Sequence, residues 1–329
     1  MAMAVPIVIN STHLRPVDTR KDLPEIADLI ELCFASTMDA DGREYIRQIR
    51  RMAFESRGIG LPVPGGRPFS VPIQGYVWQE NNHIVGNLTL IPYFKAGRVV
   101  YMIANVAVHP DYRRQGIARQ LTRRGMEHAR DHGAAAVWLQ VRDDNQGAEN
   151  LYKSLGFQER ARRTNWTYDP SGQSTLPLPH LVTIRRRTAN DWHMQRRWLQ
   201  EIYPSDVAWN LPFQIDRLQP GVWRRILRWM NGERMEHWSA WLGDHLLGAA
   251  AWEPGNAITD IIWLATNPLD EDLAAQALLT HASRILPKHR QVTVNFPAGI
   301  AEKGFKTAGF RAHNTLIWME APFTPGQAS

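Results

Sequence analysis

Apolar residues follow two different periods along the first half of the chain. Spacings of three and four residues in Leu23–Cys33 and in Ile117–Ala129 predict amphipathic helices, and Gly133 suits the end of the second one. Shorter helices are expected around Tyr45–Phe54 and Gln146–Ser154. Alternating or continuous apolar runs predict strands at Gly75–Gln79, Ile84–Ile91, Val99–Val108, Ala135–Val141 and Phe157–Tyr168. The pair Asn81-Asn82 favours a tight turn between the first two strands, and the whole pattern indicates an α/β domain.

The same order of elements returns in the second half. The segment Asp169–His180 is rich in proline, glycine and small polar residues, as linkers are. Beyond it, "ITDIIWLATNP" matches "VYMIANVAVHP", and "KGFKTAGF" matches "LYKSLGF". We therefore expect a tandem duplication of one α/β unit, with domains at residues 1–168 and 181–329 and a linker at 169–180.

Composition narrows the class of protein only slightly. The chain has 329 residues, 44% of them hydrophobic, and no apolar run approaches the roughly 18 residues of a membrane span. Without a signal-like N-terminus we expect a cytoplasmic location and no membrane partner. The only cysteine, Cys33, has helical spacing with its apolar neighbours, so we expect a core residue and no metal site. The net charge of +6 comes mostly from scattered arginine pairs, and nucleic-acid binding is ranked low.

A phosphate-binding turn is predicted where the strand Val99–Val108 meets the helix Ile117–Ala129. The first amides of a helix have no partners within it, and the helix dipole places partial positive charge there. Gly116 has no Cβ, so a large anion can approach the backbone, and Arg113 and Arg114 add full charges. The glycine spacing matches neither a P-loop nor a dinucleotide fingerprint. The segment Arg113–Ala118 is therefore predicted to hold a pyrophosphate.

The sequence around this turn resembles the GNAT superfamily of N-acetyltransferases. The run Arg113-Arg114-Gln115-Gly116-Ile117-Ala118 fits the pyrophosphate loop of that family, Arg/Gln-x-x-Gly-x-Gly/Ala. The preceding "VAVHPDYR" and the following "N..A..LYKSLGF" occur in the order and at the spacing of the family. The resemblance is specific over Gly75–Tyr168 and rests on topology alone in the second half. It implies two GNAT-like domains, each with a mixed, mostly antiparallel sheet flanked by helices.

The resemblance also implies a cosubstrate and a set of site residues. Acetyl coenzyme A would place its pyrophosphate on the amides of Gln115–Ala118 and its pantetheine arm beside Val106, Ala107 and Val108, where the strand splays from its neighbour. Asn145 would touch the arm. A neutral primary amine would attack the thioester directly, a backbone N–H near Val108 would stabilise the oxyanion, and Tyr152 would act as general acid towards the sulfur.

One part of the family pattern is missing. Many relatives carry Glu or Asp on the strand before the loop, where this chain has Ala104 and Asn105. Deprotonation of the amine would fall to ordered water, to Asp41 or Glu44, or to His109, and the sequence does not decide between them.

The second copy departs from the family more strongly. Alignment on Pro268 places Glu271, Asp272 and Ala274 opposite Arg113, Arg114 and Gly116, and Phe305 falls opposite Tyr152. The second half is therefore predicted not to bind coenzyme A and to serve architecture or acceptor binding. Trp223 and Trp229 could form a wall against the first domain.

The leading hypothesis is an acetyl-CoA-dependent N-acetyltransferase whose amine acceptor, a small molecule or a peptide, lies in a groove bordered by the second half. The alternative is a non-catalytic sensor of acyl-CoA. A monomer and a homodimer both remain open.

Overall fold

The computed structural model describes residues 13–38, 40–56, 74–169, 177–221, 223, 230, 234–255, 259–286 and 290–323. The chain divides into two compact units. Unit 1 contains residues 1–140, 147–158 and 319–329, and unit 2 contains residues 141–146 and 159–318. Within the described residues, no helix combines the length and apolar character needed to cross a membrane. The same residues contain no group of three or more His, Cys, Asp or Glu side chains placed to hold a metal ion.

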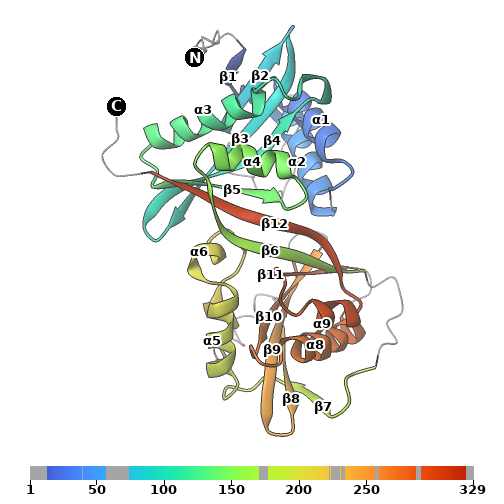
Figure 1. Ribbon diagram of the computed structural model, residues 1–329. Coiled ribbons are helices and arrows are strands. Elements are labelled where there is room, and N and C mark those ends of the chain that lie inside the picture. The colour runs from blue at the N-terminus through green and yellow to red at the C-terminus, as the bar shows by residue number, and fades with distance from the viewer. Residues whose placement is uncertain are drawn as a thin grey trace, which may run out of the picture. The chain divides into compact units, whose positions relative to one another are not determined.

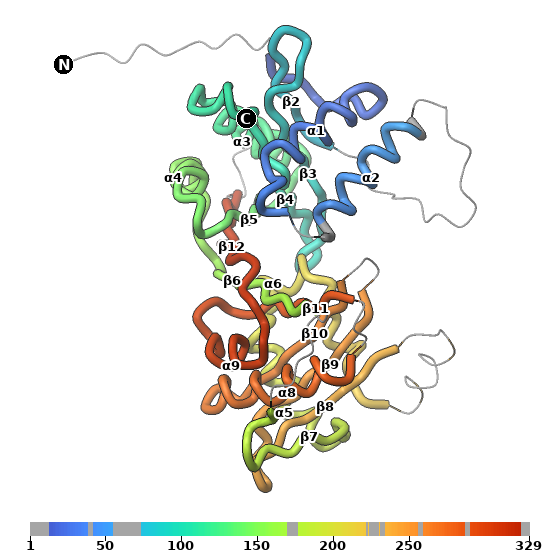
Figure 2. Tube along the Cα trace, turned by 90° about the vertical axis from the view of Figure 1, so that its right-hand side faces the viewer, coloured from blue at the N-terminus to red at the C-terminus, as the bar shows by residue number. Residues whose placement is uncertain are grey.

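Unit 1 is a sheet covered by helices on both faces. Its elements are β1 (Leu14–Pro16), α1 (Leu23–Phe34), α2 (Ala40–Ser56), β2 (Gln74–Glu80), β3 (His83–Lys95), β4 (Arg98–Val108), η1 (Pro110–Tyr112), α3 (Ile117–Asp131), β5 (Ala136–Arg142) and α4 (Gln146–Ser154). Neighbouring strands are antiparallel from β1 to β4, and β4 and β5 are parallel. Helices α1 and α2 cover one face of β2–β4 and α3 covers the other (Figures 1 and 2). The expected mixed α/β fold is confirmed.

Local sequence explains how these elements begin and end. Asn81 and Asn82 both adopt positive φ in the turn between β2 and β3, as a tight hairpin requires. Gly133 follows His132, the C-cap residue of α3, and has a φ of +70°. On the inner face of α3, a Cβ at Gly86 would lie 2.9 Å from Ile117, so the small residue lets the helix pack directly on β3.

Unit 2 repeats the same plan. Its elements are β6 (Gln158–Tyr168), β7 (Val182–Arg186), α5 (Trp192–Ile202), α6 (Ser205–Ala208), η2 (Ile215–Leu218), β8 (Glu236–Leu242), β9 (His245–Glu253), β10 (Thr259–Thr266), α8 (Glu271–Ile285), β11 (Gln291–Pro297), α9 (Glu302–Thr307) and β12 (Arg311–Pro322). The strand order is β6-β11-β10-β9-β8-β7, with the first part of β12 beside β6. Helices α5 and α8 lie on opposite faces of β9 and β10 (Figure 1).

Equivalent backbone hydrogen bonds identify the repeat residue by residue. The His109 amide donates to Val85 O at the end of β4, and the Asn267 amide donates to Leu247 O at the end of β10, both at 2.8 Å. The helices α4 and α9 close with matching bonds, from Phe157 N to Tyr152 O and from Phe310 N to Phe305 O. Phe305 is therefore the counterpart of Tyr152, as the sequence alignment predicted.

The units do not coincide with the domain ranges expected from the sequence. Strand β6, expected to close the first domain within residues 1–168, is counted with unit 2, where it pairs with β11 in antiparallel register. The last residues of β12, expected in the second domain at 181–329, are counted with unit 1, where the Phe323 amide donates to Ala135 O. Each unit thus contains a terminal strand from the other half of the sequence. Residues 170–176 of the expected linker lie outside the described residues.

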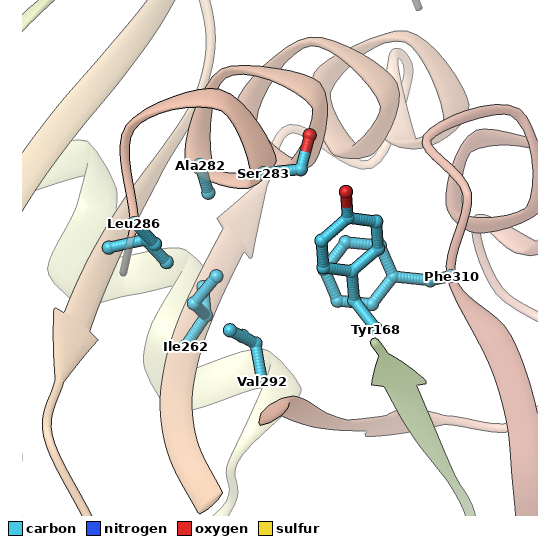
Figure 3. Close-up of a pocket in the computed structure, with 7 residues that line it drawn as sticks. All are labelled: Tyr168, Ile262, Ala282, Ser283, Leu286, Val292 and Phe310. Atoms are coloured by element: carbon cyan, nitrogen blue, oxygen red, sulfur yellow. The ribbon is translucent and has the colours of Figure 1, made fainter. Parts of the chain in front are cut away.

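A small pocket in unit 2 is lined by Tyr168, Ile262, Ala282, Ser283, Leu286, Val292 and Phe310 (Figure 3). Its walls are mostly apolar, and the hydroxyls of Tyr168 and Ser283 are the polar side-chain groups. The space is too narrow to admit a water molecule, so it is a packing gap of the unit 2 core.

Candidate active site

The turn between β4 and α3 has the backbone geometry of an anion site. Arg114 and Gly116 adopt left-handed φ values of +60° and +82°, with Gln115 between them. Gly116 is the N-cap of α3, is exposed to solvent, and has no atom within 4 Å of the place where a Cβ would stand. A left-handed residue followed by a helix N-terminus turns successive amides towards one point. The glycine is required here by conformation and not by crowding.

The amides of this turn are available for a ligand. The first intrahelical bond runs from Gln120 N to Gly116 O, at 3.1 Å. Among the described residues, the backbone N–H groups of residues 114–119 have no hydrogen-bond acceptor. Unpaired amides at a helix N-terminus, with the positive end of the helix dipole, stabilise negative charge. We refer to residues 113–118 as the cradle.

The side chains of the cradle differ in their hydrogen bonds and in their exposure to solvent. Arg113 Nε donates to Val108 O at 3.2 Å, which ties this arginine to the end of β4. Gln115 Nε2 donates to Asp111 O at 3.5 Å. Arg114 is exposed, and no contact of its guanidinium is found among the described residues. Ile117 is buried under the sheet, and Ala118 is half-buried. Arg114 therefore presents an exposed positive charge beside the unpaired amides of the cradle.

Strand β4 separates from β5 just before the cradle. The parallel pairing covers only Val100–Ile103 of β4, opposite Ala136–Leu139 of β5, although β4 continues to Val108. The register of β4 with β3 also shifts after Ala104, where Asn105 adopts a φ of +51° and forms a bulge. Val106, Ala107 and Val108 thus lie on a strand that is paired with β3 on one side and has lost its partner on the other. Such an edge can accept an extended ligand as an added strand.

Tyr152 lies on the helix that is tethered to the cradle. Arg119, in the first turn of α3, donates to Ser154 Oγ of α4 at 2.8 Å, and that hydroxyl donates to Leu151 O. The Tyr152 side chain is 6% exposed, and its ring meets Phe157 edge-on. Burial raises the pKa of Tyr152 to about 12. The hydroxyl therefore stays protonated at neutral pH.

Asn145 is the one predicted site residue outside unit 1. It belongs to residues 141–146, which are counted with unit 2, and it is exposed. Its amide donates to Arg142 O at 3.0 Å in the turn that follows β5. The cradle, the strand residues 106–108 and Tyr152 thus belong to unit 1, and Asn145 belongs to unit 2.

The residues considered as general base are engaged elsewhere or lie outside the described part of the chain. A hydrogen bond and ion pair with Arg47 lower the pKa of Glu44, which makes this carboxylate a weaker base. His109 Nδ1 accepts from the Asp111 amide at 3.3 Å and so caps η1. The side chain of Asp41 lies outside the described residues, as does Trp229.

Cys33 packs against the core under α1 and donates to Val108 O, in agreement with the expected core role.

Three polar residues that the sequence reasoning did not select gather at the bulge with Asn105. They are Tyr45 on α2 and Asn87 and Thr89 on β3. Asn105 Nδ2 donates to Tyr45 Oη at 2.9 Å and lies 3.4 Å from Thr89 Oγ1, while Asn87 Nδ2 donates to Asn105 O at 2.9 Å. A signal was present in the sequence, because Asn87 and Thr89 are polar residues two positions apart within an apolar strand and must share a face.

The corresponding helix mouth in unit 2 is closed. The N-cap of α8 is Asp270, with a φ of −130°, so this helix begins without the left-handed glycine found at α3. Asp272 Oδ1 accepts the Gly304 amide of α9 at 2.8 Å, and a Cβ at Gly304 would lie 2.3 Å from Asp272 O. Helix α9 therefore occupies the space in front of α8. Phe305 is fully buried and stacks on Trp166 with ring centroids 4.7 Å apart.

A family model matches the part of the chain that carries this site. Residues 46–157 match the model of the Acetyltransferase (GNAT) family. This segment belongs to the GNAT family. A [ribosomal protein bS18]-alanine N-acetyltransferase from Escherichia coli (strain K12) is 45% identical over 62 residues, which are 19% of this chain and 42% of that protein. A mycothiol acetyltransferase from Thermobifida fusca is 35% identical over 105 residues, which are 32% of this chain and 30% of that protein. The matches thus span less than half the length of either relative.

The GNAT fold extends to the second half of the chain. A GCN5-related N-acetyltransferase from Sphaerobacter thermophilus aligns with a TM-score of 0.58 at 17% identity, covering 96% of this chain and 97% of that one. A tandem GNAT protein from the clavulanic acid biosynthesis pathway aligns with a TM-score of 0.50 at 18% identity, covering 95% and 99%. At these identities the likeness shows the fold alone. It supports a tandem arrangement of two GNAT units.

Proposed function

We propose that unit 1 binds acetyl coenzyme A and transfers its acetyl group to a primary amine by direct attack. The row of unpaired amides at residues 114–119 is the observation that carries the proposal, because it offers a diphosphate several donors at once. The pantetheine arm would lie along Val106–Val108, where β4 has lost its partner, and the amide near Val108 would stabilise the oxyanion. Asn145 is kept as a proposed contact of the arm.

Tyr152 is proposed as the general acid that protonates the leaving thiolate. Burial keeps its hydroxyl in the acid form, which the role requires. Transfer from a phenol of pKa about 12 to a free thiolate of pKa about 8.5 would be uphill by about 5 kcal/mol. A thiolate that leaves into the same buried surroundings has a raised pKa as well, because burial disfavours its charge, and the gap then narrows. Proton transfer is therefore coupled to the exclusion of water around the sulfur.

The test is thiol release from acetyl-CoA in the presence of a panel of primary amines, with Tyr152→Phe as the variant. We expect kcat to fall about 10²-fold or more while the Kd for acetyl-CoA stays the same. Tyr203→Phe is the matched control, because Tyr203 is equally buried in unit 2 and its pKa is also raised to about 12. Binding of acetyl-CoA without turnover on any amine would reject catalysis and favour the acyl-CoA sensor.

A further inference from the structure

Arg119 connects the helix that begins at the cradle to the helix that carries Tyr152. It lies in the first turn of α3, three residues after Gly116. Its Nη2 donates at 2.8 Å to the Oγ of Ser154, the last residue of α4, and this hydroxyl donates to Leu151 O at 2.6 Å. Helices α3 and α4 lie on the same face of the unit 1 sheet (Figure 2). Two consecutive hydrogen bonds therefore run from the first turn of α3 to the residue that precedes Tyr152.

The hydrogen bond from Ser154 belongs to the last turn of α4, where Tyr152 lies. The amides of Leu155 and Phe157 both donate to Tyr152 O, at 3.0 and 3.1 Å, so the helix ends in a tightened turn. The Ser154 hydroxyl supplies a donor for Leu151 O, the carbonyl just before. The terminal turn thus holds the backbone on both sides of Tyr152, and a displacement of Ser154 would move the tyrosine with it.

The position of Arg119 is unfavourable for α3 taken alone. The first turn of a helix carries partial positive charge, so acidic side chains are stabilising there and basic ones are not. The first turn of α3 has no acidic residue, and within the described part of the chain no carboxylate pairs with Arg119. The end of α4 carries the opposite partial charge and accepts the Arg119 side chain. The arginine therefore stabilises the contact between the two helices and not α3 itself.

Unit 2 has a neutral residue in the place of this arginine. Ile117 of α3 and Ala274 of α8 are equivalent, because each lies against the glycine of the neighbouring strand. On this alignment, which differs by one residue from the one expected from the sequence, Arg119 corresponds to Gln276. The short helix α9 instead meets α8 through the close approach of its backbone at Gly304. The unit whose short helix carries the tyrosine is thus the unit with the charged bridge.

Resting on the proposed function, we propose that Arg119 is a positioning residue for Tyr152. The cosubstrate would be anchored at the cradle, and the distance from its pyrophosphate to its sulfur is limited by its own length. A general acid has to lie within about 2.6–3.2 Å of the atom that it protonates. Through Ser154, Arg119 fixes the last turn of α4 relative to the first turn of α3, so the tyrosine hydroxyl is held at a set distance from the cradle. A misplacement of about 1 Å can lower a rate by about 10²-fold.

The experiment measures kcat for thiol release with a primary amine, and the Kd for acetyl-CoA, in the full chain and in Arg119→Met. We expect kcat to fall about tenfold and Kd to stay within about threefold, because the amides of the cradle are unchanged. Ser154→Ala should give the same fall in kcat, since it removes the other partner of the same hydrogen bond, and the double variant should fall no further. Arg119→Lys keeps a donor and should raise kcat at least about threefold above that of Arg119→Met.

Arg123→Met is the matched control for the loss of charge. Arg123 lies one turn further along α3, is exposed, and has no hydrogen bond or ion pair among the described residues. We expect both kcat and Kd to stay unchanged in this variant. A fall in kcat equal to that of Arg119→Met would overturn the inference, because the charge of the helix and not the bridge would then be responsible.

The Tyr152→Phe background shows whether Arg119 acts through the tyrosine hydroxyl. If it does, Arg119→Met lowers kcat no further in that background. The same fall with and without the hydroxyl would overturn the inference, and so would a tenfold weaker Kd at unchanged kcat, which would make Arg119 a ligand of the phosphates. Failure of the unmodified chain to acetylate any amine, or an unchanged kcat in Tyr152→Phe alone, would instead reject the proposed function itself.

Discussion

Replacement of Gly116 by glutamate should abolish tight binding of acetyl-CoA without unfolding unit 1. Gly116 has a φ of +82° and an exposed, uncrowded position, so a side chain there meets no atom and strains only the backbone. A left-handed conformation costs a non-glycine residue about 1–2 kcal/mol. The new carboxylate would stand at the N-terminus of α3, where it would compete for the amides of residues 114–119 and repel the pyrophosphate.

The loss of affinity follows from the hydrogen bonds that the cradle would forfeit. A hydrogen bond to a charged group contributes about 1.5–3 kcal/mol. Loss of two such bonds from the cradle is roughly 3–6 kcal/mol, which is at least about 100-fold in Kd. Isothermal titration with acetyl-CoA measures this change, and a thermal unfolding curve without ligand measures the backbone strain separately.

Gly133→Glu is the control for strain. Gly133 has a φ of +70° at the other end of α3, is exposed, and likewise has no atom within 4 Å of its Cβ position. We expect a similar loss of stability and an unchanged Kd. The reasoning is refuted if Gly116→Glu binds acetyl-CoA within threefold of the unmodified protein, or if the two variants lose affinity equally.

Two further predictions concern stability. Burial raises the pKa values of Tyr152 and Tyr203 from near 10 to about 12, so each contributes stability that is complete below pH 10 and is lost as pH rises towards 12. Urea unfolding should show that the free energy of unfolding falls by about 1 kcal/mol per tyrosine between pH 9 and pH 11. In each tyrosine-to-phenylalanine variant the part of this fall that is due to the replaced tyrosine should be absent. A free energy of unfolding that does not change with pH would contradict the burial argument. Replacement of Met319 by alanine should lower the free energy of unfolding by about 2–5 kcal/mol, because Met319 is fully buried in the part of β12 that belongs to unit 1. Leu181→Ala, at a residue that is 83% exposed, should leave the melting temperature unchanged, and equal melting temperatures for both variants would refute the packing role of Met319.

Short-range features of the fold could be predicted because their causes are local. The Asn81-Asn82 turn, the end of α3 at Gly133 and the left-handed Gly116 each follow from the conformational range of one or two residues. The cradle was predictable for the same reason, since its donors are consecutive amides. Tyr152 could be placed on a short helix, but its raised pKa depends on burial by the whole unit and has no local signal.

The polar residues at the bulge, Tyr45, Asn87, Thr89 and Asn105, could not be brought together from the sequence. Asn87 and Asn105 are separated by a full hairpin, and they meet only because the register of β3 with β4 shifts at the bulge. A shift of one residue turns the following side chains to the other face, and no local pattern in Val99–Val108 announces it. Sequence reasoning therefore treated Asn105 as a missing carboxylate, whereas the structure gives its amide and carbonyl partners of their own.

The sequence pattern also could not predict that β6 belongs to unit 2 and that the last residues of β12 belong to unit 1. An apolar run predicts a strand but not the strand with which it pairs. Without β6 and β12, the edges of β5 and β11 would present the same unpaired backbone groups, so either strand could be added at either edge. In β6, Asn165 faces Asn295 of β11 and Asn314 of β12, and these amide contacts hold the strand in unit 2. A cut at residue 168 would remove Met319 and Ala321, both buried residues of unit 1, so we expect it to destabilise the first half of the chain.

Comparison of the two units distinguishes features that both share from features that are found in unit 1 alone. Unit 2 keeps the glycine under its long helix, at Gly248 against Ala274, and it keeps the backbone bonds that end β10 and α9. It has no left-handed glycine at the start of α8, no hydroxyl at Phe305 and no polar cluster in β9. Features required for packing would be retained in both copies, because both have the same layers. The left-handed glycine, the tyrosine hydroxyl and the polar residues at the bulge are found only in unit 1, so the stability of a sheet with these layers does not require them.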